Sequence, residues 1–112
     1  MSEILKADSL TWESIRPDVA AGVYGQTLLD DHVKIVLTRV ARGGKFALHR
    51  DDYGHLFYFL SGAGSVRVAD KESAASAGLM VRVVAGEEHA YENTGMEDLM
   101  LISVNLPDRE KR

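Results

Sequence analysis

Short apolar runs separated by turn-forming residues make up most of the chain. The runs are rich in β-branched and aromatic residues and end at Gly, Asn or Asp, which is typical of short β-strands. We predict strands over residues 32–40, 55–61, 64–70, 79–85, 89–93 and 99–106, with a weaker one at 22–30. Many short strands at close spacing predict an all-β sandwich or barrel.

Little of the chain follows the helical period of 3.6 residues. The pattern allows a short helical turn within residues 8–15, capped by Asp8 or Ser9. The Ala-rich stretch 72–78 is too short to predict a helix. We expect residues 1–20 to form an N-terminal arm and the charged tail, about 107–112, to be frayed.

Several of the predicted strands are apolar on both faces. In the strand 55–61, Phe57 and Phe59 point to one side, while Leu56, Tyr58 and Leu60 point to the other. Such a strand buries both faces only if a second sheet, the N-terminal arm or another subunit covers the outer one. We therefore expect a homodimer, which sedimentation would test.

Length, charge and cysteine content exclude several classes of protein. The 112 residues suit one domain, residues 1–112, with a single core. The net charge is −4 and the basic residues are scattered, so no nucleic-acid partner is expected. No apolar run approaches the ~20 residues that span a bilayer and no signal pattern begins the chain, so we expect no membrane and a cytoplasmic location. The chain has no cysteine, which excludes disulfides and thiolate metal sites.

The stretch HRDDYGH, residues 49–55, contains two histidines and two aspartates within seven positions. His49 and Asp51 are two residues apart, so on a strand they point to the same side. The next three residues suit a tight connection, after which His55 opens another strand. Two neighbouring antiparallel strands would thus bring His49, Asp51 and His55 together.

A fourth polar group comes from a distant part of the chain. His89 follows a Gly-containing turn and starts a strand, whereas His32 starts an earlier strand with no partner nearby. Imidazole is the commonest metal ligand in proteins, and nitrogen and oxygen donors suit one divalent ion such as Mn, Fe, Ni or Zn. The alternative is a metal-free pocket, in which His55 and Asp51 form a hydrogen-bonded pair.

These residues resemble the two sequence motifs of a small single-domain cupin. The first motif reads Gly, five or more residues, His-x-His, three or four residues, Glu, six residues, Gly. Its positions are held here by Gly44, His49, Asp51, His55 and Gly62. The second reads Gly, five residues, Pro-x-Gly, two residues, His, three residues, Asn, and its positions are held by Gly78, Val84, Gly86, His89 and Asn93. Together the motifs cover residues 43–95, about half of the chain.

The resemblance implies a double-stranded β-helix, or jelly-roll β-barrel, with a divalent metal at one mouth. Three positions depart from the motifs: Asp51 replaces a His, His55 replaces the Glu and Val84 replaces the Pro. The implied ligand set is His49, Asp51, His55 and His89, which keeps the usual ligand charge of −1 because Asp and Glu carry the same charge. If the shorter Asp51 does not reach the metal, a three-histidine site with an open face remains, as in some cupin dioxygenases.

Four further residues are candidates for contact with a small-molecule ligand. Tyr91 shares a side of its strand with His89, and Ser103 and Asn105 share a side of the last strand. Arg39 would anchor an anionic substrate if its side of the strand faces the barrel. Otherwise Arg39 is merely exposed at a strand end.

The cupin resemblance implies a metalloenzyme that oxidises or isomerises a small oxygen-bearing metabolite, as a dioxygenase or a sugar-acid isomerase does. Alternatives are a non-catalytic cupin that binds a metabolite, with or without metal, and a metal-free structural dimer. His49, Asp51 and His89 also match the facial triad of iron oxygenases that use 2-oxoglutarate, but the chain is short for them and the first basic residue after His89 is Arg109. The end of the chain faintly resembles a small cupin of pectin breakdown, whose acidic residue is missing here, so that function is not adopted.

Overall fold

The computed structural model describes residues 2–107, and nearly all of them are in strands or connecting turns. The described part contains one 3-10 turn and nine strands. They are η1 (Ala7–Ser9), β1 (Glu13–Ser14), β2 (Ala20–Asp30), β3 (Lys34–His49), β4 (Gly54–Ser61), β5 (Gly64–Val68), β6 (Lys71–Ala75), β7 (Met80–Val83), β8 (His89–Asn93) and β9 (Leu99–Leu106). The all-β prediction is confirmed. The tail predicted to fray lies, beyond residue 107, outside the described residues, and so does Arg109.

The start of the chain differs from the predicted helical turn. The helical residues end at Ser9, and the N-cap is Lys6, which makes no side-chain cap within the described chain. The residues that follow are extended, because Glu13 and Ser14 pair with Gly25 and Tyr24 of β2. The helical-turn prediction was therefore wrong in position and in its capping residue.

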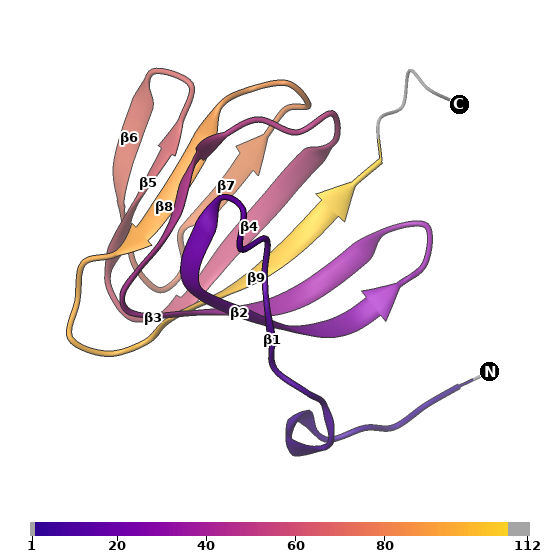
Figure 1. Cartoon of the computed structure of the whole chain (residues 1–112). Helices are drawn as coiled ribbons and strands as arrows, with labels where there is room; N and C mark the ends of the chain where they lie inside the picture. Colours follow the sequence, from indigo (N-terminus) through magenta and orange to yellow (C-terminus); the bar gives the residue numbers. More distant parts are fainter. Residues whose placement is uncertain (1, 108–112) are drawn as a thin grey trace.

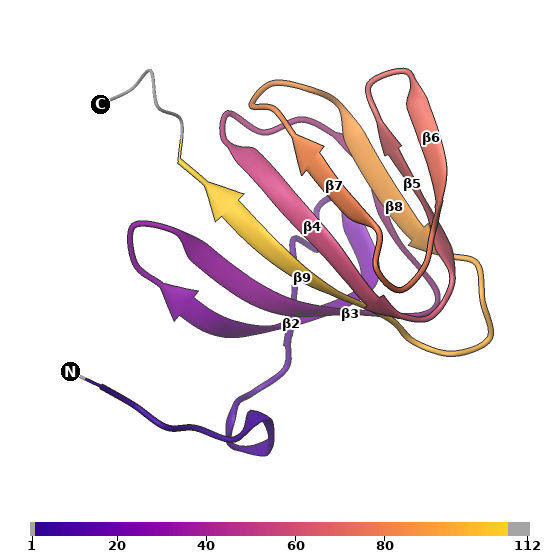
Figure 2. The ribbon, with the colours of Figure 1, turned by 180° about the vertical axis from the view of Figure 1, so that it is seen from behind.

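The strands form one curled antiparallel sheet in the order β6-β5-β8-β3-β9-β4-β7, with β2 beside β3 and β1 beside β2. β3 joins the two halves of this sheet, β6-β5-β8 on one side and β9-β4-β7 on the other. Its residues 34–40 pair with β9, and its residues 45–49 pair with β8. Figures 1 and 2 show β3 passing from one half to the other, with the β2–β3 hairpin extending away from β5 and β6. The curl brings β4 opposite β8, and the ring centroids of Phe57 and Tyr91 lie 5.3 Å apart across the interior. This is the expected jelly-roll barrel.

Glycines at the crossing of β2 and β3 allow β3 to bend instead of ending. The β2–β3 register shifts between Ala21 and Val23, and Gly22 has a φ of +69°. A Cβ atom on Gly44 would lie 2.8 Å from the carbonyl oxygens of Ala41 and Gly22, so only glycine fits. The strand predicted over 32–40 therefore continues through the glycines to His49.

Inward side chains fill one end of the barrel, here called the closed end. Its centre consists of Val40, Phe59, Leu99 and Leu101, all 0% exposed. Full burial of each such side chain contributes roughly 1.5–3 kcal/mol to folding.

The outer face of β4 and β7 is exposed and, apart from Arg82, apolar. It presents Tyr58, Leu60 and Met80 to solvent. The homodimer that these strands suggest stays a prediction. Within residues 2–107, no helix has the length and apolar character that crossing a membrane requires.

Candidate metal centre

The opposite end of the barrel holds a cavity of about 290 Å³, here called the cavity end. Its lining combines residues of the N-terminal arm with inward residues of the strands: Glu13, Ser14, Ile15, Arg16, Gly25, Thr27, Lys34, Val36, Thr38, Phe46, His49, His55, Phe57, His89, Tyr91, Ser103 and Asn105. Three of the four histidines therefore meet there. The fourth, His32, is exposed, and its Nδ1 atom lies 3.5 Å from Oδ1 of Asp31.

A bulge in β3 directs His49 into the barrel. Phe46 pairs with Tyr91 and His49 pairs with His89, but the register shifts between these two pairs. The irregular spacing changes the phase of the strand, so that Phe46 and His49, three residues apart, both line the cavity. His49 and His89 consequently lie side by side, with ring centroids 4.3 Å apart.

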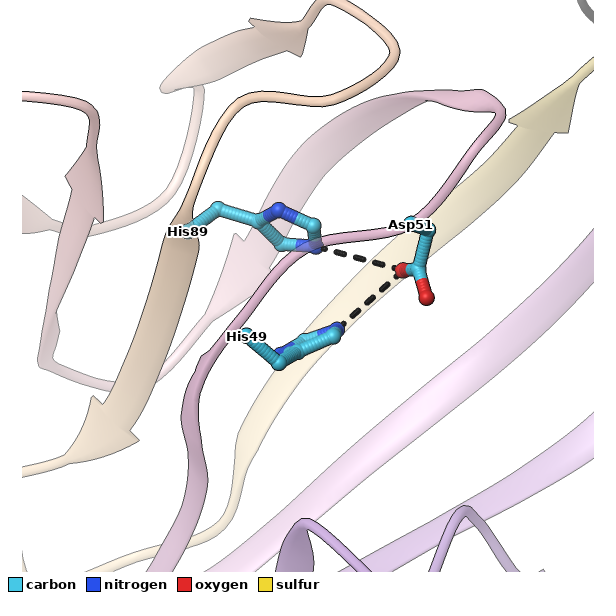
Figure 3. Close-up of side chains that lie close together, drawn as sticks. All are labelled: His49, Asp51 and His89. Atoms are coloured by element: carbon cyan, nitrogen blue, oxygen red, sulfur yellow. Dashed lines mark hydrogen bonds and ion pairs between the residues drawn. The ribbon is translucent and has the colours of Figure 1, made fainter.

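Asp51 lies in the connection between β3 and β4, and its carboxylate faces the imidazoles. Its backbone carbonyl accepts a hydrogen bond from Gly86 (2.8 Å), which fixes the connection to the turn before β8. Its Oδ2 atom lies 2.9 Å from Nε2 of His55, 3.2 Å from Nε2 of His49 and 3.6 Å from Nε2 of His89. Figure 3 shows the rings of His49 and His89 converging on this carboxylate.

Backbone carbonyls set the protonation of two of the imidazoles. Nδ1 of His49 lies 2.8 Å from the carbonyl oxygen of Ala47, and Nδ1 of His89 lies 3.0 Å from that of Glu87. A carbonyl only accepts, so each Nδ1 carries a proton and a neutral ring leaves a lone pair on Nε2. On a neutral ring that lone pair points toward the Asp51 carboxylate, and a cation between the two groups would satisfy both.

The charge states of the cluster favour a metal ion over a proton as that cation. Burial lowers the pKa of His89 to about 4, so its ring is neutral at pH 7. Burial also lowers the pKa of His55, against the opposing effect of Asp51. Burial alone would raise the pKa of Asp51, but hydrogen bonds from His55 and Arg16 lower it below its usual value. Neutral imidazoles beside an ionised carboxylate are a donor set that fits a divalent metal.

His49, Asp51 and His89 form a group whose ligand atoms all lie within 4.8 Å of one another. His55 joins this group through Asp51, to which its Nε2 makes the shortest contact, and its ring also bonds with the Asn105 side chain. The structure thus brings together all four predicted ligands. From its one position, His55 suits two roles: a fourth metal ligand, or the hydrogen-bond partner of Asp51.

Three of the four predicted ligand-contact residues line the cavity. Tyr91 is buried, and burial raises the pKa of its hydroxyl well above the usual value while a hydrogen bond with Ser103 opposes the shift. The Ser103 hydroxyl also lies 3.0 Å from that of Thr38. Asn105 lies beside His55 in the same lining. These groups offer hydroxyl and amide contacts to a small polar ligand.

Arg39 lies on the outer face of β3, so its expected contact with a substrate is not supported by its position. The inward face of this part of β3 consists of Lys34, Val36 and Thr38, and strand alternation turns Arg39 outward. Its guanidinium lies 4.8 Å from the ring of Trp12 and 5.0 Å from that of Tyr24. Arg39 thereby holds the N-terminal arm against the sheet.

Sequence reasoning missed two basic residues of the cavity. Lys34 lies on the inward face of β3, whereas Arg39 lies on the outward face. The alternation of side chains along a strand would have identified Lys34 once the inward face was known. Arg16 had no signal, because it follows the two-residue strand β1 and has a φ of +42°. Its Nη1 atom lies 3.1 Å from Oδ1 of Asp51.

Comparisons with known proteins agree with this fold. A family model described as a cupin domain matches residues 36–105. Among solved structures, a predicted oxalate decarboxylase from Thermotoga maritima has a TM-score of 0.85 at 23% identity, covering 95% of this chain and 100% of that one. The polyketide cyclase RemF from Streptomyces resistomycificus has a TM-score of 0.84 at 18% identity, covering 94% and 79%. KdgF from Halomonas sp. has a TM-score of 0.82 at 17% identity, covering 97% and 98%. No curated protein matches the chain significantly.

Proposed function

The chain belongs to the cupin domain family, and we propose that it is a metal-binding cupin that acts on a small oxygen-bearing metabolite. One observation carries the proposal. Oδ2 of Asp51 lies within 3.6 Å of three imidazole Nε2 atoms, and two of these rings have their proton held on the far nitrogen by a backbone carbonyl. His49, Asp51 and His89 would hold one divalent ion (Mn, Fe, Ni or Zn), with His55 as a fourth ligand or as the partner of Asp51.

The cavity lining supports a small polar substrate. When bound, the metal supplies a Lewis acid that polarises a substrate oxygen. The Ser103 hydroxyl and the Asn105 amide would orient the substrate by hydrogen bonds, while Ile15 and Phe57 exclude water from its apolar part. Lys34 adds a positive charge that suits an acidic group. The neighbours in fold are named for different activities, a predicted oxalate decarboxylase and a polyketide cyclase, because fold does not fix reaction.

A non-catalytic role is the second candidate, and a specific observation favours it. Asp51 already accepts hydrogen bonds from His55 at 2.9 Å and from Arg16 at 3.1 Å. The carboxylate is thus partly satisfied by the protein itself, as in a cavity that binds a metabolite without metal. Turnover by the metal-loaded protein would separate the two roles.

Elemental analysis and calorimetric titration with Mn²⁺, Fe²⁺, Ni²⁺ and Zn²⁺ test the metal proposal. The variants are His49→Ala and His89→Ala, and the matched control is His32→Ala, whose side chain is 87% exposed. We expect about one ion per chain for the wild type and the control, and at least about a 100-fold loss of affinity in the two cluster variants. Equal affinity in all four proteins would contradict the proposal.

Ligand screening then tests the metabolite. Thermal shifts are measured with small hydroxy acids, sugar acids and neutral sugars, with and without bound metal, since a ligand of the folded state raises the melting temperature. Asn105→Ala should reduce the shift caused by a true ligand. A screen in which only the metal-free protein responds would favour the non-catalytic reading.

A further inference from the structure

Arg16 reaches the candidate metal centre from the N-terminal arm and contacts only one side of the Asp51 carboxylate. Its Nη1 atom lies 3.1 Å from Oδ1. Each of the three imidazole contacts is made to the other oxygen, Oδ2, at 2.9, 3.2 and 3.6 Å. The two carboxylate oxygens are therefore divided, one for the guanidinium and one for the imidazoles.

The guanidinium of Arg16 is itself held in place. Its Nε and Nη2 atoms each lie 3.3 Å from an oxygen of Asp18, a two-pronged pairing that fixes the plane of the group and leaves Nη1 for Asp51. The backbone of Arg16 has a φ of +42°, which is uncommon for a residue with a side chain. Its carbonyl oxygen accepts hydrogen bonds from Val19 (2.9 Å) and Ala20 (2.8 Å), so the turn into β2 maintains this conformation.

The arm that carries Arg16 is attached to the sheet at a second place. The side-chain amide of Gln26 donates to the carbonyl oxygens of Ala7 (3.0 Å) and Leu10 (3.2 Å). Gln26 is 2% exposed, so these bonds are shielded from water. With Trp12 against Arg39, they keep the arm over the cavity end.

We infer that Arg16 is a positioning residue of the metal centre, which holds Oδ1 of Asp51 and so presents Oδ2 as the single carboxylate ligand. This inference rests on the proposed metal binding. A carboxylate left to rotate would meet a metal through one oxygen or both, whereas a paired one is oriented before the metal arrives. Asp18 acts one step further out, by orienting Arg16.

Titration of the metal-free protein with Zn²⁺ and Co²⁺ tests this role. Arg16→Gln is compared with Arg50→Gln, which removes the same charge next to Asp51 in the sequence. Arg50 is 66% exposed and pairs with Glu88 at 3.5 Å, so its removal leaves the Arg16–Asp51 pair in place. We expect Arg16→Gln to weaken metal binding about 10–100-fold, and Arg50→Gln to change it by less than about 3-fold.

Two further readouts separate positioning from a general loss of structure. Arg16→Lys keeps a donor for Oδ1 but lacks the fork that pairs with Asp18, so it should recover part of the lost affinity. The visible absorption of bound Co²⁺, which reports the number and kind of its ligands, should change in Arg16→Gln and not in Arg50→Gln. Thermal unfolding without metal checks that each variant is folded.

The outcomes distinguish this inference from the proposed function. Wild-type affinity and an unchanged Co²⁺ spectrum in Arg16→Gln, tighter binding, or a loss no larger than in Arg50→Gln would each overturn the inference and leave metal binding intact. A wild type that binds neither of these ions, nor Mn²⁺, Fe²⁺ or Ni²⁺, would overturn both. If Arg16→Gln does not fold, Asp18→Asn decides, with a several-fold weaker affinity expected and an unchanged one overturning the inference.

Discussion

The closed end and the cavity end of the barrel are built from the same strands but are filled by different kinds of side chain. Along β9, the inward residues are Leu99 and Leu101 at the closed end, and Ser103 and Asn105 at the cavity end. The change from apolar to polar falls between Leu101 and Ser103, two residues apart on one continuous strand. The strand framework therefore does not dictate what each end contains.

β4 shows the same change in the opposite chain direction, from His55 at the cavity end to Phe59 at the closed end. Burial of Phe59 stabilises the fold, whereas burial of a neutral imidazole costs free energy unless its nitrogens are paired. The comparison indicates that the closed end supplies stability and the cavity end supplies chemistry. Substitutions at the two ends should therefore have separable effects.

The largest effect on stability is expected at the closed end. Phe59→Ala should lower the free energy of unfolding by about 3–5 kcal/mol, because it removes a fully buried ring and leaves a cavity. Leu60→Ala, on the outer face of the same strand, should cost about 0.5 kcal/mol. Urea unfolding measures both, and the metal stoichiometry of the folded variants should not change. Equal losses at the two positions would contradict the comparison.

Protonation of the cavity end gives the next effect. The pKa of His89 is about 4 in the folded protein and about 6.5 in the unfolded chain, so between these values the unfolded chain binds more protons. The stability of the metal-free protein should therefore fall as the pH falls from 6.5 to 4, by about 1.4 kcal/mol per pH unit and on the order of 3 kcal/mol in all.

Urea unfolding at several pH values with a chelator present measures this dependence. His89→Leu should flatten the slope, and His32→Leu should leave it unchanged. Some slope remains in His89→Leu, because the pKa of His55 is lowered in the same direction. Asp51 acts in a different range, since its pKa is lowered and its contribution disappears only below about 3.8. An identical slope in wild type and His89→Leu would show that folding does not lower the pKa of His89.

A smaller effect is expected where the two ends meet. The hydroxyl of Ser103 bonds with Thr38 at 3.0 Å and also with Tyr91, and all three residues are buried. Ser103→Ala should lower the free energy of unfolding by about 1–2 kcal/mol, because two buried hydroxyls each lose a partner. Ser61→Ala, at an exposed position, is the control. No difference between the two variants would mean that water replaces the lost hydroxyl.

The sequence was sufficient to predict most of the strands, though not β1 or β6, and it placed three members of the histidine cluster near one another. Apolar alternation is a local property, so most strand positions were predictable. The spacing of His49, Asp51 and His55 around a tight connection limits where their side chains point. The continuation of β3 past Gly43 was missed, because a glycine pair indicates a turn as strongly as it indicates a bend.

Other features depend on contacts that no local pattern encodes. The position of Arg16 results from a turn and from pairing with Asp18, neither of which has a periodic signal. The inward face of β3 was also undetermined, since both Val36 and Leu37 are apolar and the two faces of the strand look alike. Arg39 was considered for the cavity for this reason, and Lys34 was overlooked.

The smallest effect tests the position of Arg39. Its guanidinium lies within 5.0 Å of the centres of two aromatic rings, and each such contact contributes about 0.5–1 kcal/mol at an exposed site. Arg39→Gln should therefore lower the free energy of unfolding by about 1 kcal/mol, and a double-mutant cycle with Trp12→Leu should recover about half of this as coupling. Metal affinity and ligand-induced thermal shifts should stay within about 2-fold of the wild type, because Arg39 lies outside the cavity. A variant with unchanged stability and lost ligand binding would instead place Arg39 in the ligand site.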